Sequence, residues 1–102
     1  VILISSCGGT KKQLQRGNYD AVINKSVKKL IKNPDSEEDA RLLDKAYKLA
    51  NDRELERVKY LKMENNPNNC DEVFANYESL KARQSRVRTV LPLKLDGRNV
   101  SY

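Results

Sequence analysis

The sequence has no histidine and no tryptophan, and it holds only two cysteines, one methionine and one phenylalanine. Histidine is the most common general base in enzymes, so its absence removes the usual starting point for acid–base catalysis. With only Cys7 and Cys70 as thiols, the ligands for a soft-metal site are also missing. We therefore predict a protein that is not an enzyme and that holds neither a metal ion nor a cofactor.

Long apolar runs are absent as well. Mean hydropathy is −0.78 and 33% of the residues are charged, whereas a membrane-spanning helix needs about 20 mostly apolar residues. The first residues, Val1 to Ile4, form a short apolar run that is followed by Ser5, Ser6, Cys7 and two glycines.

This order is that of the end of a bacterial lipoprotein signal peptide. Small side chains let the signal peptidase close around the bond to be cut, and the cysteine thiol accepts a diacylglycerol. We predict that residues 1–6 are a signal-peptide remnant and that Cys7 is the lipid-attachment residue. The alternative is an ordinary thiol in a flexible terminus.

The net charge of +6 is unevenly distributed. Residues 11–32 carry seven basic side chains against Asp20, and residues 81–98 carry six against Asp96. Basic residues beside a lipid anchor fit attraction to anionic headgroups, although solvated helix faces are an equally good explanation. We expect no nucleic-acid binding, because no aromatic side chains are interleaved with the basic residues.

Apolar residues at helical spacing predict four helices, at about residues 18–33, 36–50, 53–64 and 71–88. Asn33-Pro34 should end the first, and Asp35 or Ser36 should cap the second. We expect Asn51-Asp52 to separate the second helix from the third. Residues 7–16 show no apolar period and are predicted to be a polar tether, and Cys70 is expected to be half-buried at the start of the last helix.

After Thr89 the pattern changes to alternation around Asp96-Gly97, a favoured two-residue hairpin turn. We therefore predict a β-hairpin over residues 90–102. A lone two-stranded hairpin is marginally stable in water, so it should either pack on the helices or continue into a longer parent protein, and we favour the continuation.

Residues 17–34 and residues 50–67 have the same order of features: a helix entrance, an amphipathic helix and a closing Asn-Pro. The two prolines, Pro34 and Pro67, lie 33 residues apart. Such a period indicates two-helix solenoid repeats. The first segment resembles the second helix of a tetratricopeptide repeat, where Gly-x-Tyr (Gly17 and Tyr19) opens the helix and proline closes it. Residues 37–67 then resemble a complete repeat. The prediction is an all-α domain of antiparallel helix pairs over residues 17–89, and a generic helical bundle is the alternative.

The whole chain resembles the N-terminal part of an uncharacterised family of Bacteroidota lipoproteins. The segments that carry this resemblance are Ser5–Gly8, Gly17–Ala21, Arg83-Gln84, Val90–Leu93 and Gly97-Arg98. It implies an envelope location and a longer parent protein. Exported lipoproteins of that phylum usually carry acidic residues after the cysteine, and Lys11-Lys12 depart from that signal. The resemblance therefore implies an outer-membrane anchor that faces the periplasm.

Four tyrosines could line a peptide-binding groove or fill gaps in the core. We expect Tyr19 and Tyr47 to be core residues. The candidate interaction surface consists of two tyrosines and three arginines near the end of the last helix: Tyr60, Tyr77, Arg83, Arg86 and Arg88.

Together these patterns predict a lipid-anchored helical-repeat scaffold for protein–protein interaction at the bacterial envelope. Its expected partners are the membrane, through the lipid anchor, and other envelope proteins, in an oligomeric state that the sequence does not define. Two alternatives remain. One is an accessory lipoprotein of outer-membrane protein assembly or secretion, and the other is the N-terminal module of an envelope enzyme whose active site lies in a C-terminal part.

Overall fold

The computed structural model describes the backbone of residues 2–102 and the side chains of residues 9–102. Over this range the chain forms four α-helices, one short 3₁₀ helix and a two-stranded antiparallel sheet. In order these are α1 (Ile2–Gln15), α2 (Tyr19–Lys32), α3 (Glu37–Met63), η1 (Pro67–Asn69), α4 (Cys70–Arg88), β1 (Leu93–Leu95) and β2 (Arg98–Val100).

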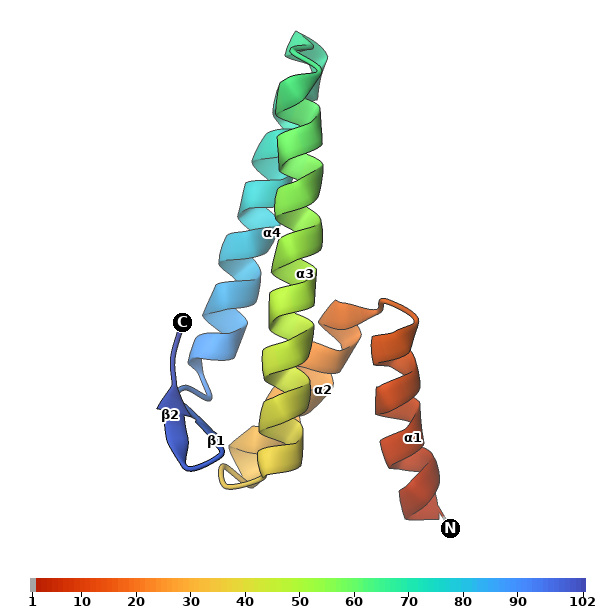
Figure 1. Cartoon of the computed structure of the whole chain (residues 1–102), viewed down its shortest axis with the longest axis vertical. Helices are drawn as coiled ribbons and strands as arrows, with labels where there is room; N and C mark the ends of the chain where they lie inside the picture. Colours follow the sequence, from red (N-terminus) through yellow and green to blue (C-terminus); the bar gives the residue numbers. More distant parts are fainter. Residues whose placement is uncertain (1) are drawn as a thin grey trace.

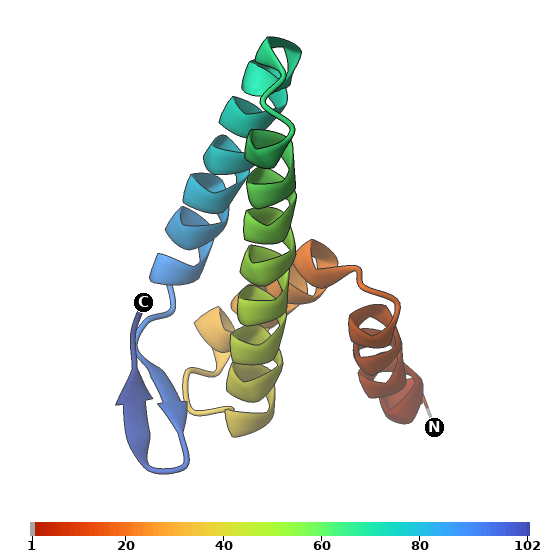
Figure 2. The same ribbon diagram turned by 45° about the horizontal axis from the view of Figure 1, so that its top comes forward.

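Consecutive helices run antiparallel and pack against each other, and α3 and α4 form a long hairpin with η1 at its tip (Figure 1). The molecule measures 50 × 29 × 19 Å. In both ribbon views the tip projects well beyond α2, while α1 and the β-hairpin lie toward the other end (Figures 1 and 2). The predicted all-α class, with antiparallel helix pairs and a C-terminal β-hairpin, is confirmed.

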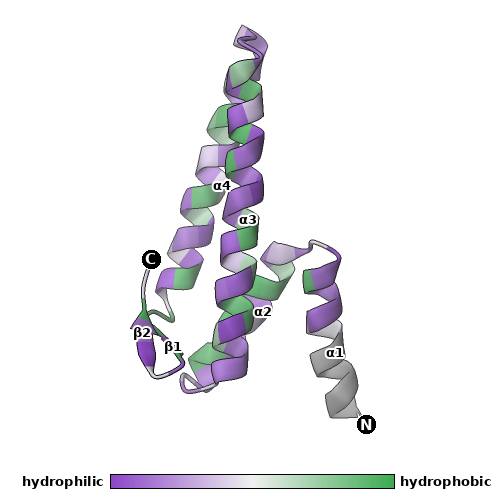
Figure 3. Ribbon diagram, viewed as in Figure 1, coloured by the Kyte–Doolittle hydropathy of each residue, from purple (hydrophilic) through white to green (hydrophobic). Residues whose placement is uncertain are grey.

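The hydrophobic core lies where α2 crosses the first half of α3. Figure 3 shows apolar residues on the parts of α2 that are visible beside α3. The buried set from these two helices is Val22, Ile23, Val27, Leu30, Ala40, Leu43, Ala46, Tyr47 and Ala50. The alanines allow α2 to approach α3 closely, and Val87 at the end of α4 completes this layer.

Helix α3 is continuous from Glu37 to Met63, so the predicted break at Asn51-Asp52 is wrong. No glycine or proline lies between these ends, and Asn or Asp inside a helix costs less than about 1 kcal/mol. Of the two predicted caps, Asp35 and Ser36, Ser36 caps the start, because its hydroxyl accepts a hydrogen bond from the Asp39 backbone amide. Residues 37–67 are therefore not a helix–turn–helix repeat.

Residues 7–15, predicted as part of a polar tether, belong to α1. This helix packs on α2, and its half-buried Leu14 contacts the core. Gly17 makes the tight turn into α2 with a φ of +84°, a conformation that a side chain would strain. The predicted roles of Cys7 and of residues 1–6 lie outside the described side chains.

The β-hairpin has the predicted turn, in which Asp96 and Gly97 both have positive φ angles of 50° and 76°. It packs on the helices: Leu93 and Leu95 are buried against the core, and β1 contacts α3. Beyond β2, the ring of Tyr102 lies against Tyr47 with a centroid distance of 4.5 Å. The hairpin is therefore part of the fold.

The two tyrosines expected in the core are there. Tyr47 is buried, and Tyr19 is half-buried against the core, with the Arg53 guanidinium 4.5 Å from its ring centroid. The hydroxyl of Tyr102 donates a hydrogen bond to the Asp44 carboxylate. Burial and this hydrogen bond raise the pKa of Tyr102 well above its usual value of 10.

Candidate interaction surface

Large apolar side chains are exposed mainly on the distal part of the α3–α4 hairpin. Among residues 9–102, five of the six exposed large apolar residues lie there. We call this set the distal apolar surface: Leu55, Tyr60, Met63, Phe74 and Tyr77. Met63 is 76% exposed and Phe74 is 66% exposed. Monomeric soluble proteins rarely leave such side chains clustered in water, so this surface is a candidate binding site.

The exposure follows from the shape of the hairpin. Beyond the core, α3 and α4 pack against each other and against η1, and no further helix of residues 2–102 lies beside them (Figure 1). Each helix can therefore bury one narrow stripe of residues, and in α3 this stripe includes Val58 and Leu61. Among the described residues no third helix covers the apolar side chains outside that stripe, and they remain in contact with solvent.

Two shallow hollows lie at the distal apolar surface. One, of about 450 Å³, lies between the end of α3, η1 and the start of α4, with Phe74 and Tyr77 in its wall. The other, of about 400 Å³, is lined by Leu55 and Met63. Lys62 and Tyr77 line both hollows, and within the described chain the charged residues that line them are Lys59 and Lys62. A partner would therefore meet apolar walls and positive charge.

Local contacts fix the shape of this end. The side-chain amide of Asn69 donates a hydrogen bond to the Leu61 backbone carbonyl over 3.0 Å, which links η1 to the end of α3. The Lys62 ammonium donates to the Tyr77 hydroxyl over 2.9 Å, and Arg57 pairs with Glu72 at 2.9 Å. These contacts link α3 to the segment that follows it, so the hollows are formed without a partner.

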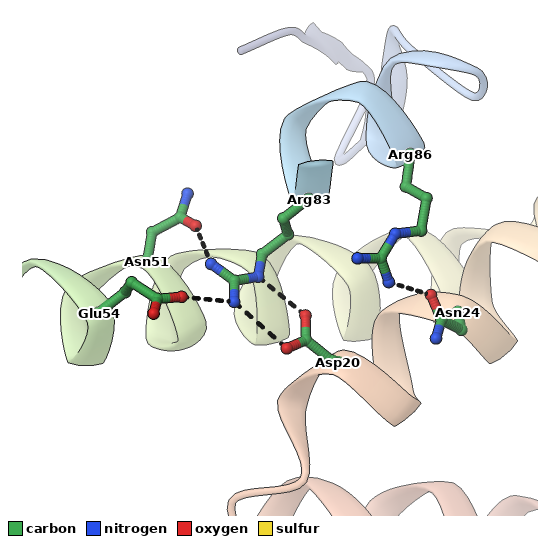
Figure 4. Close-up of polar contacts among 6 residues, drawn as sticks. All are labelled: Asp20, Asn24, Asn51, Glu54, Arg83 and Arg86. Carbon is green, nitrogen blue, oxygen red and sulfur yellow. Dashed lines mark hydrogen bonds and ion pairs between the residues drawn. The ribbon is translucent and has the colours of Figure 1, made fainter. Parts of the chain in front are cut away.

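A second polar feature lies where α2, α3 and α4 meet. The guanidinium of Arg83 on α4 donates to the Asp20 carboxylate at 2.8 and 3.2 Å, to the Asn51 side-chain oxygen at 2.9 Å and to Glu54 at 2.9 Å (Figure 4). We call these four residues the Arg83 cluster. Because Arg83 is only 4% exposed, its prediction as part of an interaction surface is wrong.

The Arg83 cluster also explains two pKa shifts. Burial by itself would lower the pKa of Arg83, but hydrogen bonds to Asp20 and Glu54 outweigh it, and the pKa is raised. The same hydrogen bond lowers the pKa of Asp20, and burial opposes this only in part. Arg83 and Asp20 are therefore charged at neutral pH, and the Arg83 cluster joins three helices.

The remaining predicted surface residues are not brought together. Tyr60 and Tyr77 are exposed in the distal apolar surface, whereas Arg86 and Arg88 are exposed at the other end of α4. Arg86 donates to the Asn24 side chain of α2 over 2.6 Å (Figure 4). Cys70 is exposed rather than half-buried. Leu55, Met63 and Phe74 were not predicted for this surface, because apolar residues at helical spacing are normally core residues.

Within the described residues, no group of three or more His, Cys, Asp or Glu side chains is arranged to bind a metal ion. No helix there combines the length and the apolar character that crossing a bilayer requires.

No family model matches the chain, and no curated protein or solved structure matches it at a significant level. The candidate function therefore depends on the distal apolar surface and on the sequence patterns.

Proposed function

We propose that the chain is a lipid-anchored helical scaffold that binds another protein of the bacterial envelope through its distal apolar surface. The observation that carries the proposal is the concentration of exposed large apolar side chains on the distal part of the α3–α4 hairpin. Interface cores are enriched in tyrosine, phenylalanine and methionine, and this surface contains all three.

The chemistry of the surface favours an amphipathic segment that carries acidic side chains. The hollows would receive apolar side chains of a partner helix, spaced by three or four residues. Lys59 and Lys62 in their walls would pair with carboxylates beside those apolar residues. A segment rich in lysine or arginine would meet like charge there and bind less well.

The position of the surface supports a partner away from the anchor. Cys7, the proposed lipid-attachment residue, belongs to α1, and α1 lies far from the tip that holds η1 (Figure 1). The long axis of the molecule measures 50 Å. A scaffold anchored through α1 would therefore have its distal apolar surface available to proteins beyond the headgroups.

A matched pair of peptides tests the binding proposal. One peptide carries leucines at helical spacing with glutamates between them, and the other has lysines in place of the glutamates. We expect the chain to bind the acidic peptide and not the basic one, as measured by fluorescence anisotropy. Met63→Ser combined with Phe74→Ser should weaken binding at least about tenfold, because each buried side chain contributes about 1.5–3 kcal/mol.

Ile31→Ser is the control, since Ile31 is exposed on α2 outside the distal apolar surface. It should leave peptide binding unchanged. The proposal is overturned if both peptides bind equally or if neither binds. If the chain instead self-associates through Met63 and Phe74, as seen by analytical ultracentrifugation, the occupant of the surface is a second copy and the partner assignment is wrong.

The anchor is tested separately. Cys7→Ser in the full precursor should abolish labelling by a radioactive fatty acid, because serine has no thiol to accept the diacylglycerol. Cys70→Ser is the matched control and should keep the label. Retained label in the Cys7→Ser precursor would exclude lipid attachment at this residue, and membrane fractionation of both variants completes the measurement.

A further inference from the structure

Helix α2 has two faces of different character. Its buried residues, Val22, Ile23, Ser26, Val27 and Leu30, lie toward α3. Its four lysines lie at positions i, i+3, i+4 and i+7, a spacing that places them on one stripe of a helix. We call this stripe the lysine face: Lys25, Lys28, Lys29 and Lys32. Lys29 is half-buried and the other three are exposed.

The charge of this region is not compensated within the described chain. Residues 9–34 contain seven basic residues and one acidic residue, Asp20, which is engaged by Arg83. None of the seven has an ion-pair partner within 4.0 Å among the described residues. The three beyond the lysine face are exposed on α1 or in the turn after it: Lys11, Lys12 and Arg16.

We propose that the lysine face docks on the surface of an anionic phospholipid bilayer. Clustered basic residues on a helix are attracted to the negative potential of such a surface. Ile31 is 62% exposed and lies between Lys28 and Lys32 along the helix, so an apolar side chain is available to enter the headgroup boundary. This interaction needs neither the lipid on Cys7 nor the distal apolar surface.

A lipid surface fits this region better than a single-stranded nucleic acid does. Proteins that bind single strands combine basic residues with exposed aromatic rings on which bases stack. The large aromatic side chains exposed among residues 9–102 are Tyr60, Phe74 and Tyr77, which all lie in the distal apolar surface and not on α2. The region therefore offers charge and one aliphatic side chain, without a stacking platform.

Vesicle co-sedimentation of the unlipidated chain tests the proposal. We expect binding to vesicles in which about a third of the lipid is phosphatidylglycerol, and no binding to pure phosphatidylcholine vesicles. Raising the salt from about 0.1 M to about 1 M should abolish it, because the charges are then screened. Lys25→Gln, Lys28→Gln and Lys32→Gln together should weaken binding on the order of a hundredfold, or about fivefold for each lysine.

The matched control removes three positive charges elsewhere, by Lys45→Gln, Lys81→Gln and Arg88→Gln. These residues are exposed outside α2, and the control should bind nearly as well as the native chain. Equal weakening in both variants, or binding to neutral vesicles, overturns the proposal. So does tighter binding to a short DNA duplex than to the anionic vesicles, if the α2 variant also loses that binding. Circular dichroism of both variants checks that α2 remains folded.

Discussion

Replacing Arg83 with alanine is expected to lower the free energy of unfolding by about 3–5 kcal/mol, because a buried ion-pair partner is removed and the other charges are left behind. Glu54, whose side chain is 16% exposed, would lose its ion pair, and Asn51 would lose a hydrogen bond. The link between α2, α3 and α4 would be lost as well. Urea denaturation followed by circular dichroism measures this change.

Arg86→Ala provides the matched control three residues further along α4. Arg86 is exposed and makes a hydrogen bond to a neutral amide, so its removal should cost no more than about 1 kcal/mol. If Arg83→Ala costs no more than Arg86→Ala, the Arg83 cluster does not stabilise the fold. Adding Glu54→Gln to Arg83→Ala should recover at least about 1 kcal/mol, since the unpaired buried charge is then gone.

The Arg83 cluster also predicts that the free energy of unfolding decreases at acidic pH. The pKa of Asp20 is lowered below its unfolded value of 3.8 by the hydrogen bond and charge of Arg83. A lowered folded pKa means that Asp20 contributes stability above pH 3.8, and that this contribution is lost as the pH falls through the folded pKa. Asp20→Asn should therefore show a shallower loss of stability below about pH 4. If the free energy of unfolding falls with pH equally steeply in Asp20→Asn and in the native chain, protonation of Asp20 is not coupled to unfolding.

The parts of the fold that depend on neighbouring residues were predictable from the sequence. Asn33-Pro34 predicted the end of α2, Asp35-Ser36 predicted the start of α3, and Asp96-Gly97 predicted the hairpin turn. In each case the residue determines the structure through its own backbone preference or through a bond to a residue at most three positions away. Such signals need no knowledge of tertiary contacts.

The incorrect predictions concern residues whose environment is set by distant parts of the chain. Asn51 was interpreted as a helix break, but it lies inside α3, where its side chain accepts a hydrogen bond from Arg83, 32 residues away. Arg83 was predicted to be exposed because a charged residue is rarely buried without partners, and Asp20 lies 63 residues away. The spacing of the apolar residues in α4 likewise does not show that Phe74 is left uncovered by a third helix in the part of the chain that the structure describes.

The distal apolar surface shows the same limit for the candidate site. Tyr60 and Tyr77 could be proposed from the sequence because tyrosine is common at interfaces. Met63 and Phe74 could not, because an apolar residue at helical spacing is normally a core residue. Only the packing of α3 against α4 shows that these positions lie outside the buried stripe.

The second large effect is expected for Leu93→Ala, which should lower the free energy of unfolding by about 2–5 kcal/mol. Leu93 is 1% exposed, and with Leu95 it packs the β-hairpin into the same core as α2, α3 and Val87. Removing its branched end leaves a cavity among residues that are fixed by three helices, so the site has little freedom to collapse. Thermal or urea unfolding measures the loss.

Lys94→Ala tests the neighbouring position on the same strand. Lys94 is exposed and pairs with exposed Asp35 at 2.7 Å, so water screens the pair and its loss should change the free energy of unfolding little. Because a two-stranded hairpin is marginal by itself, its strands should lose protection from amide hydrogen exchange only when the core opens. If Leu93→Ala costs no more than Lys94→Ala, or if the hairpin amides exchange long before those of α3, the hairpin is a separate unit resting on the helices and not a part of their core.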